Sequence, residues 1–194
     1  MTRDQSLSED WKRLRKYRLT TSISFKQICC PKKDFHKLAE NFPSGRCVTT
    51  AAMLYGLKHE NEASEAYVKL TGNNVYSVGI VINPTAPYLS CFPDRQVFDS
   101  KMISAERFGL LEIKCPQANS YIELPYLQLK NRGYTLKTNN MYFHQIQGQM
   151  GIAGAKNMHL ERIKFDKEFF QSMKDKVDIF YFTYFSSAII KNKI

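Results

Sequence analysis

The sequence lacks the features that mark several large classes of protein. None of its apolar stretches reaches the roughly 20 residues that a membrane-spanning helix needs. Its five cysteines include no Cys-x-x-Cys pair, and its four histidines show no ligand spacing with them, which argues against a zinc site. An odd number of cysteines without an apolar leader predicts reduced thiols in an intracellular protein, nuclear in a eukaryote and otherwise cytoplasmic.

Acidic residues are also scarce. The chain has 18 acidic and 28 basic residues, a formal net charge of +10 and a pI near 9.4. Residues 1–37 hold ten basic and four acidic side chains, so this segment carries six of the ten net charges. Such a balance predicts a polyanionic partner, most simply nucleic acid, and the alternative is a basic but inert surface.

The apolar pattern predicts one α+β domain over residues 11–190, preceded by a flexible segment over residues 1–10. We find no internal repeat and no linker in the 194 residues. Helices are predicted over 11–18, 23–28, 32–41, 47–56, 57–70, 140–154 and from 166 onward. Strands are predicted over 75–82, 88–92, 109–115, 134–136 and 158–165, with 96–99 as a possible extension of the second.

The segment Gly109–Pro116 contains an unusual pair of charges. It has the pattern of a short, mostly buried strand that Pro116 ends, yet it carries Glu112 and Lys114. Strand side chains alternate, so these two charges lie on the same face. Buried charges are costly, and the pair is therefore either a structural ion pair on an edge strand or part of a site that binds a metal and a phosphate or water.

Other carboxylates are placed to join this pair. Glu60 lies at the edge of the predicted inward stripe of helix 57–70, which is formed by Ala63, Ala66, Tyr67 and Leu70. Asp94 follows a predicted strand and is expected close to the neighbouring strand that carries Glu112. Asp99 is the alternative to Asp94, because it also lies near a strand end.

Two further segments carry polar groups suited to a site. Thr20, Thr21 and Ser22 precede a predicted helix and follow several arginines, so they form either a phosphate-binding helix start or an ordinary N-cap. In helix 140–154, Gln145 and Gln149 form a polar ridge beside the apolar face. Gly148 and Gly151 disfavour a helix, which indicates close packing at these two positions.

Five of these segments, taken in order, resemble the YqaJ viral recombinase family, a lambda exonuclease-like group within the PD-(D/E)XK nuclease superfamily. The segments that carry the resemblance are Trp11–Arg15 with Leu19–Ser22, Gly56–Ala63, Phe92–Arg95, Gly109–Pro116 and Tyr142–Gln149. Each is weak alone, and the specificity comes from their order and spacing across most of the chain.

The resemblance implies a restriction-endonuclease-like core, in which helices flank a mixed central sheet. It implies a DNA exonuclease that digests duplex ends in the 5′→3′ direction with Mg²⁺ or Mn²⁺. It also suggests that the chain assembles into a ring-shaped trimer and that its partner is a single-strand annealing recombinase. By resemblance, Asp94, Glu112 and the Ile113 carbonyl hold the metal, and Glu60 contributes to the metal site. Lys114 and Gln145 would act on the attacking water. Arg15 and Ser22 would bind the 5′-phosphate.

The sequence departs from the family pattern in two places. Arg95 follows Asp94 where the family has glycine, and arginine resists backbone shapes that glycine allows. Near residues 155–158 the chain is expected to lack one family strand, which would expose a sheet edge. A splice product, or a decaying copy of a viral or mobile element, would account for both departures. The alternative function is therefore a catalytically inactive DNA-binding module of the same fold.

Overall fold

The computed structural model describes residues 2–22, 24–32, 34–42, 50–103, 105–118, 120–131, 133–159 and 163–191. The α-helices are α1 (Glu9–Lys16), α2 (Ser24–Cys29), α3 (Phe35–Asn41), α4 (Ala51–Thr71), α5 (Met141–Ala153), α6 (Lys167–Phe180) and α7 (Ser186–Lys191). Shorter helical segments are η1 (Thr2–Leu7), η2 (Ala105–Arg107), η3 (Tyr121–Glu123) and the π-helical η4 (Tyr181–Phe185). The strands are β1 (Leu19–Thr20), β2 (Asn74–Ser77), β3 (Val81–Ile82), β4 (Leu89–Cys91), β5 (Arg95–Phe98), β6 (Phe108–Leu111), β7 (Leu127–Lys130), β8 (Gly133–Leu136), β9 (Asn157–His159) and β10 (Ile163–Lys164).

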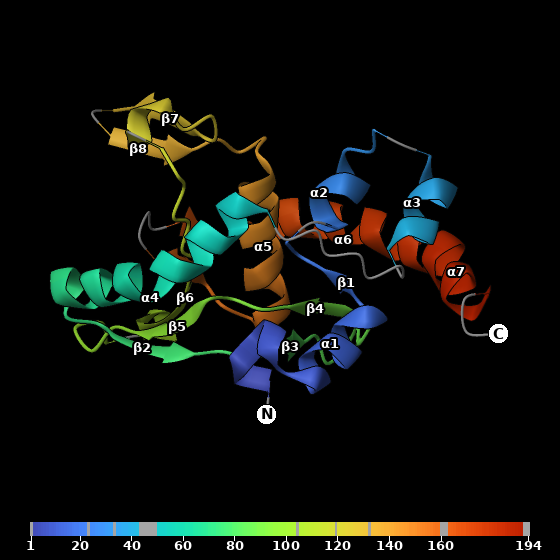
Figure 1. Cartoon of the computed structure of the whole chain (residues 1–194), viewed down its shortest axis with the longest axis horizontal. Coiled ribbons are helices and arrows are strands. Elements are labelled where there is room, and N and C mark those ends of the chain that lie inside the picture. The colour runs from blue at the N-terminus through green and yellow to red at the C-terminus, as the bar shows by residue number, and fades with distance from the viewer. Residues whose placement is uncertain are drawn as a thin grey trace.

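The strands form a mixed sheet, as predicted. The larger sheet has five strands in the order β10-β9-β6-β5-β2, in which only the β6–β9 pair is parallel. A three-stranded sheet, β1-β4-β3, continues it through the short link between β4 and β5, and its β1–β4 pair is parallel. The β7–β8 hairpin stands apart from both sheets at the top of Figure 1.

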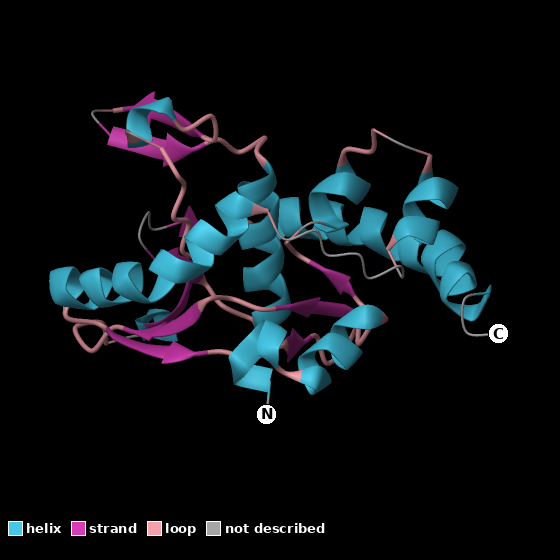
Figure 2. Cartoon of the chain, viewed as in Figure 1, coloured by secondary structure: helices cyan, strands magenta, loops and turns pink. Residues whose placement is uncertain are grey.

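Helix α5 is the central helix of the fold. It packs against β3 and β4 of the three-stranded sheet, against β9 of the five-stranded sheet and against α2 and α6, while α4 runs along the five-stranded sheet (Figure 2). Asn140 caps α5 by accepting from the Tyr142 amide, and Gly154 ends it in a left-handed conformation with φ of 69°. Both boundaries were predicted from sequence.

The two α5 glycines permit close helix packing. A Cβ at Gly148 would lie 2.8 Å from the Phe25 ring on α2 and 2.9 Å from the Thr21 methyl group. A Cβ at Gly151 would overlap the Phe170 ring on α6. The low helix propensity of glycine is thus offset by the contacts it allows, as the sequence indicated.

The main apolar core lies around α6 and η4. Met173, Val177, Phe180 and Phe185 are buried there, and Val177 and Phe180 are fully so. The helix predicted from residue 166 onward therefore supplies much of the apolar core. No helix within the described ranges is long and apolar enough to cross a membrane.

Several predicted boundaries were wrong. The strand expected over 109–115 ends at Leu111, and the strand expected over 75–82 divides into β2 and β3, which belong to different sheets. The helices expected over 47–56 and 57–70 are one continuous helix from Ala51, while residues 47–49 lie outside the described ranges.

The predicted inward stripe of α4 was right at Tyr67 and wrong at Ala66 and Leu70. Leu70 is 82% exposed, whereas Ser64 and Tyr67 are buried. Tyr67 packs against Val97 and Leu111 of the sheet. The apolar periodicity of this sequence was too weak to fix the buried face within one residue.

Residues 1–10 were expected to be flexible, and the sheet was expected to have an exposed edge near residues 155–158. Within residues 1–10, η1 lies against the body, where the Gln5 amide donates to the carbonyl oxygens of Val78 and Pro93 at 3.4 and 3.5 Å. Strand β9 covers β6 on the side away from β5. The flexibility of residues 1–10 and the loss of a family strand near 155–158 stay predictions.

Candidate active site

The candidate site begins at the link between the two sheets. Asp94 lies on this link, immediately before the first residue of β5. Because Arg95 pairs with Leu111 in the β5–β6 register, Asp94 reaches the residues that follow β6. Its Oδ2 atom accepts a hydrogen bond from the Ile113 amide at 2.6 Å, and Glu112 precedes that residue. The chain thus brings Asp94 beside the Glu112–Lys114 segment, as predicted.

Asp99 lies at the opposite end of the same hairpin. It follows Phe98, which pairs with Phe108 at the start of β6, and its carboxylate accepts from the Lys101 amide at 3.1 Å. The four residues of β5 span about 13 Å. This placement favours Asp94 over Asp99 as the partner of Glu112.

Glu112 is held by three side-chain donors. Its side chain is only 5% exposed. Oε1 pairs with the Lys114 ammonium and accepts from the Gln145 amide, while Oε2 accepts from the Gln149 amide at 2.8 Å. Both glutamines come from α5, one helical turn apart. The predicted residues Glu112, Lys114 and Gln145 are therefore in direct contact.

Gln149 was missed as a site residue. The sequence placed it on a polar ridge with Gln145 but gave it no role. The i, i+4 spacing of the two glutamines was the signal, because side chains four residues apart lie on the same helix face. Two amide donors on one carboxylate fix its orientation more firmly than one.

Lys114 contacts an aromatic residue, Tyr142, which in turn packs against Tyr126, and sequence reasoning gave neither a role in the site. Its ammonium lies 5.0 Å from the centre of the Tyr142 ring, and the Tyr126 ring packs edge-on against Tyr142 at 5.0 Å. Tyr142 lies three residues before Gln145 on the same helix face, which was a usable signal. Nothing in the sequence pointed to Tyr126, which precedes β7.

The charges around Lys114 keep its ammonium protonated. Burial alone would lower the pKa of Lys114, but the negative charges of Glu112 and Asp94 outweigh burial and raise it to about 12. The side chain remains 31% exposed. Without a metal, Lys114 is therefore a fixed positive charge at neutral pH rather than a base.

The carboxylates crowd one another. Burial and the charges of Glu112 and Glu60 raise the pKa of Asp94 to about 7, although Lys114 and the Ile113 amide act in the opposite direction. The oxygen donors of Asp94 and Glu112 suit a hard divalent cation, and a cation would relieve the repulsion between them. These two residues fit a metal site. Across the described ranges, no group of three or more His, Cys, Asp or Glu side chains is arranged to hold a metal ion.

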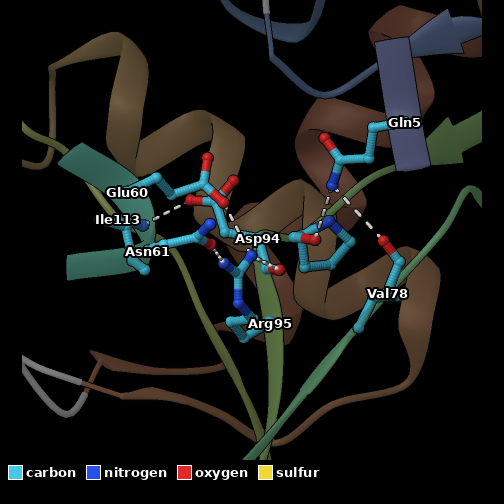
Figure 3. Close-up of polar contacts among 8 residues, drawn as sticks. Gln5, Glu60, Asn61, Val78, Asp94, Arg95 and Ile113 are labelled. Carbon is cyan, nitrogen blue, oxygen red and sulfur yellow. Dashed lines mark hydrogen bonds and ion pairs between the residues drawn. The ribbon is translucent and has the colours of Figure 1, made fainter. Parts of the chain in front are cut away.

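Glu60 is engaged by arginine. Arg95 Nη1 donates to Glu60 Oε1 at 2.7 Å and to the Asp94 carbonyl oxygen at 2.7 Å, and Nη2 donates to Asn61 Oδ1 at 2.7 Å (Figure 3). Figure 3 shows the Glu60, Asp94 and Arg95 side chains pointing toward one another. The sequence placed Glu60 near the site and identified Arg95 as a departure, but gave no sign of the contact with Asn61.

The two N-terminal segments of the family resemblance, Trp11–Arg15 and Leu19–Ser22, lie at the three-stranded sheet. The Arg15 guanidinium lies 4.9 Å from the Trp11 ring centre and 5.4 Å from the Phe92 ring centre. Phe92 comes two residues before Asp94. Ser22 follows β1, and because β1 runs parallel to β4, Ser22 and Asp94 leave their strands at the same edge. The helix after Ser22 has only six residues, so the case for phosphate binding rests on the side chains.

The fold and this cluster define an α+β protein of the alkaline exonuclease fold. The structure superimposes on an alkaline exonuclease (LHK-Exo) from Laribacter hongkongensis with a TM-score of 0.69, 22% sequence identity, and coverage of 96% of this chain and 97% of that chain. For LHK-Exo in complex with dAMP the TM-score is 0.71, with the same identity and coverage. At this identity the likeness establishes the fold.

The sequence itself identifies the family. The profile of the YqaJ-like viral recombinase domain matches residues 10–156, and the chain belongs to this family. The resemblance drawn from the five ordered segments is confirmed. No curated protein matches the chain.

Proposed function

We propose that the protein is a divalent-metal-dependent deoxyribonuclease that removes nucleotides from the ends of duplex DNA in the 5′→3′ direction. One observation carries the proposal: Glu112, nearly buried, is oriented by Lys114, Gln145 and Gln149 beside Asp94. A purely structural ion pair needs no second carboxylate and no pair of glutamines. Family membership and the basic N-terminal segment support the same function.

Asp94, Glu112 and the Ile113 carbonyl would hold Mg²⁺ or Mn²⁺. Such a cation lowers the pKa of bound water and neutralises charge on the scissile phosphate. Lys114 would position the attacking water or help to deprotonate it, and its ammonium lies 5.0 Å from the centre of the Tyr142 ring. Gln145 and Gln149 keep the Glu112 carboxylate from rotating away from Asp94.

Digestion of linear duplex DNA tests the proposal. We expect Mg²⁺-dependent release of nucleotides, and we expect Lys114→Ala and Glu112→Ala each to abolish it. Lys69→Ala and Glu65→Ala are matched controls, because both residues are exposed on α4. A label at the 5′ or the 3′ end reports the polarity of digestion. Full activity in both site variants would exclude the proposed mechanism.

A catalytically inactive DNA-binding module is the second candidate, and the Arg95–Glu60 pair favours it. A guanidinium beside the carboxylates competes with a metal for their charge. This function predicts salt-sensitive DNA binding without cleavage. If Arg95→Gly created cleavage in an otherwise inactive protein, the arginine would be the cause of the inactivity.

Self-association is a further part of the proposal. Met53, Leu54 and Leu57 on α4 are 51%, 57% and 64% exposed. Exposed apolar residues of this size often mark a contact with another chain. Light scattering of the purified protein would distinguish a trimer from a monomer, and co-purification with a single-strand annealing recombinase would test the partner that the family suggests.

A further inference from the structure

Arg95 is locked in place by three hydrogen bonds. Its two terminal nitrogens donate to Glu60 Oε1, to Asn61 Oδ1 and to the Asp94 carbonyl oxygen, all at 2.7 Å (Figure 3). The Arg95 side chain is 12% exposed and that of Glu60 is 25% exposed. The pair therefore lies largely out of solvent and joins α4 to the start of β5.

A metal ion would have to displace Arg95 in order to bind Glu60 at the paired oxygen. Displacement would leave a mostly buried guanidinium without its counter-charge, which is strongly unfavourable. It would also break the bonds to Asn61 and to the Asp94 carbonyl. The Arg95 contacts thus hold the paired oxygen of Glu60 away from a cation. Glu112 also has a cationic partner, Lys114, but that side chain is 31% exposed and can turn toward solvent, whereas Arg95 is 12% exposed and makes three hydrogen bonds.

The charge balance fits a single ion. Glu60, Asp94 and Glu112 carry three negative charges when ionised, and Arg95 and Lys114 carry two positive charges. One divalent cation changes the local sum from −1 to +1, which matches one phosphodiester anion. A second divalent cation would raise it to +3.

We infer that Arg95 takes the place of a cation at Glu60, so that Glu60 is the partner of Arg95 and the site binds one divalent ion on Asp94 and Glu112. This inference rests on the proposed function, because it concerns the metal site proposed there. It makes Arg95 and Glu60 positioning residues that set the number of metal ions.

Mn²⁺ binding to the DNA-free full chain tests the inference by calorimetry, with bound ions counted by electron paramagnetic resonance. We expect one ion in the wild type and a loss of affinity of more than tenfold in Asp94→Asn. The double variant Glu60→Gln/Arg95→Gln keeps the local charge sum unchanged. It should bind one ion with an affinity within threefold of the wild type.

The single variant Arg95→Gln frees Glu60. It should gain a second ion or at least tenfold in affinity, and adding Glu60→Gln should remove that gain. A tenfold loss in the double variant, or no gain in Arg95→Gln, overturns the inference while leaving the proposed nuclease intact. No Mn²⁺ binding to the wild type but Glu60-dependent binding to Arg95→Gln would leave only the blocking of Glu60 by Arg95, and would overturn both the one-ion site and the proposed function. No binding to either protein overturns both.

A second measurement does not depend on the stability of any variant. Crystals of the wild-type protein soaked in Mn²⁺ should show an anomalous peak at Asp94 and Glu112, with the Arg95–Glu60 pair intact. A peak coordinated by Glu60 would overturn the inference directly.

Discussion

Gln149 donates from its amide nitrogen to Oε2 of Glu112 at 2.8 Å, from a position on α5 where its own side chain is only 1% exposed. This bond completes the set of donors around Glu112, since Lys114 and Gln145 both use the other oxygen. A carboxylate that is held at both oxygens has one orientation, and a metal ligand benefits from that constraint.

Gln149→Leu should lower the rate of DNA digestion by about tenfold to a hundredfold, because residues that orient metal ligands typically contribute this much. The weakened step is metal binding, so excess Mn²⁺ should recover part of the activity. Gln171→Leu is the matched control, because Gln171 is exposed on α6 and donates to Asp175 at 2.7 Å. Equal rates in the two variants would show that Gln149 is ordinary core.

Asp94 should make the stability of the metal-free protein depend on pH. Its pKa rises from 3.8 to about 7 on folding, because burial and the charges of Glu112 and Glu60 favour the protonated form. The folded state therefore binds the proton more tightly than the unfolded state. This stabilisation is fully present below about pH 4 and is lost as pH rises through about 7.

Urea unfolding in EDTA checks this dependence. Between pH 5 and pH 8 the wild-type protein should lose stability, and Asp94→Asn should lose much less. Mg²⁺ should restore stability at pH 8, where Asp94 is ionised and can bind it. An unchanged pH dependence in Asp94→Asn would remove Asp94 as its cause.

The sequence was sufficient to predict the residues at the centre of the site. Glu112 and Lys114 are two positions apart, Gln145 lies on a well-capped helix, and Asp94 follows a short strand. These are local patterns, and each survived although β6 ends at Leu111 before either charge. Lys114 still pairs with Glu112, although both residues follow the end of β6.

Long-range contacts could not be predicted in the same way. The pairing of Arg95 with Glu60 and Asn61 joins residues more than thirty positions apart, and it depends on how α4 lies along the sheet. The predicted inward stripe of α4 was right at Tyr67 but wrong at Leu70, so the direction of Glu60 could not be refined from it. Tyr126 reaches Tyr142 only because the β7–β8 hairpin folds back toward α5.

Gly151→Ala should destabilise the protein although alanine favours helices. The added methyl group would overlap the Phe170 ring, and overpacking of this kind costs about 1–3 kcal/mol. Gly56→Ala on α4 is the matched control. Its Cβ would lie 3.8 Å from the Cys115 carbonyl oxygen, an ordinary contact, so helix propensity should stabilise that variant by about 1 kcal/mol or less.

Thermal and urea unfolding of both glycine variants would measure the difference. The essential result is that the two variants change the stability in opposite directions, because both substitutions add the same methyl group to an α-helix. If Gly151→Ala were as stable as the wild type, α5 and α6 would be packed less closely than the structure places them.

Arg15 should determine whether the protein recognises a 5′-phosphate. Its guanidinium lies against the rings of Trp11 and Phe92. Phe92 is two residues before Asp94, so these rings hold the guanidinium near the site. The wild-type protein should digest 5′-phosphorylated duplexes about tenfold or more faster than 5′-hydroxyl duplexes, which is the value of one charged hydrogen bond. Arg15→Ala should remove that preference. Arg15→Lys should retain only part of it, because lysine stacks less well on aromatic rings.

Arg13→Ala separates a specific contact from general charge. Arg13 lies on the same helix, its side chain is 76% exposed, and it pairs with Asp10 at 3.1 Å. Its loss should weaken DNA binding slightly and lower the salt dependence of binding by no more than about one phosphate contact, while the preference for a 5′-phosphate persists. If Arg13→Ala and Arg15→Ala had the same effect on both kinds of DNA end, the N-terminal segment would act only through its positive charge, and the 5′→3′ direction would require a different origin.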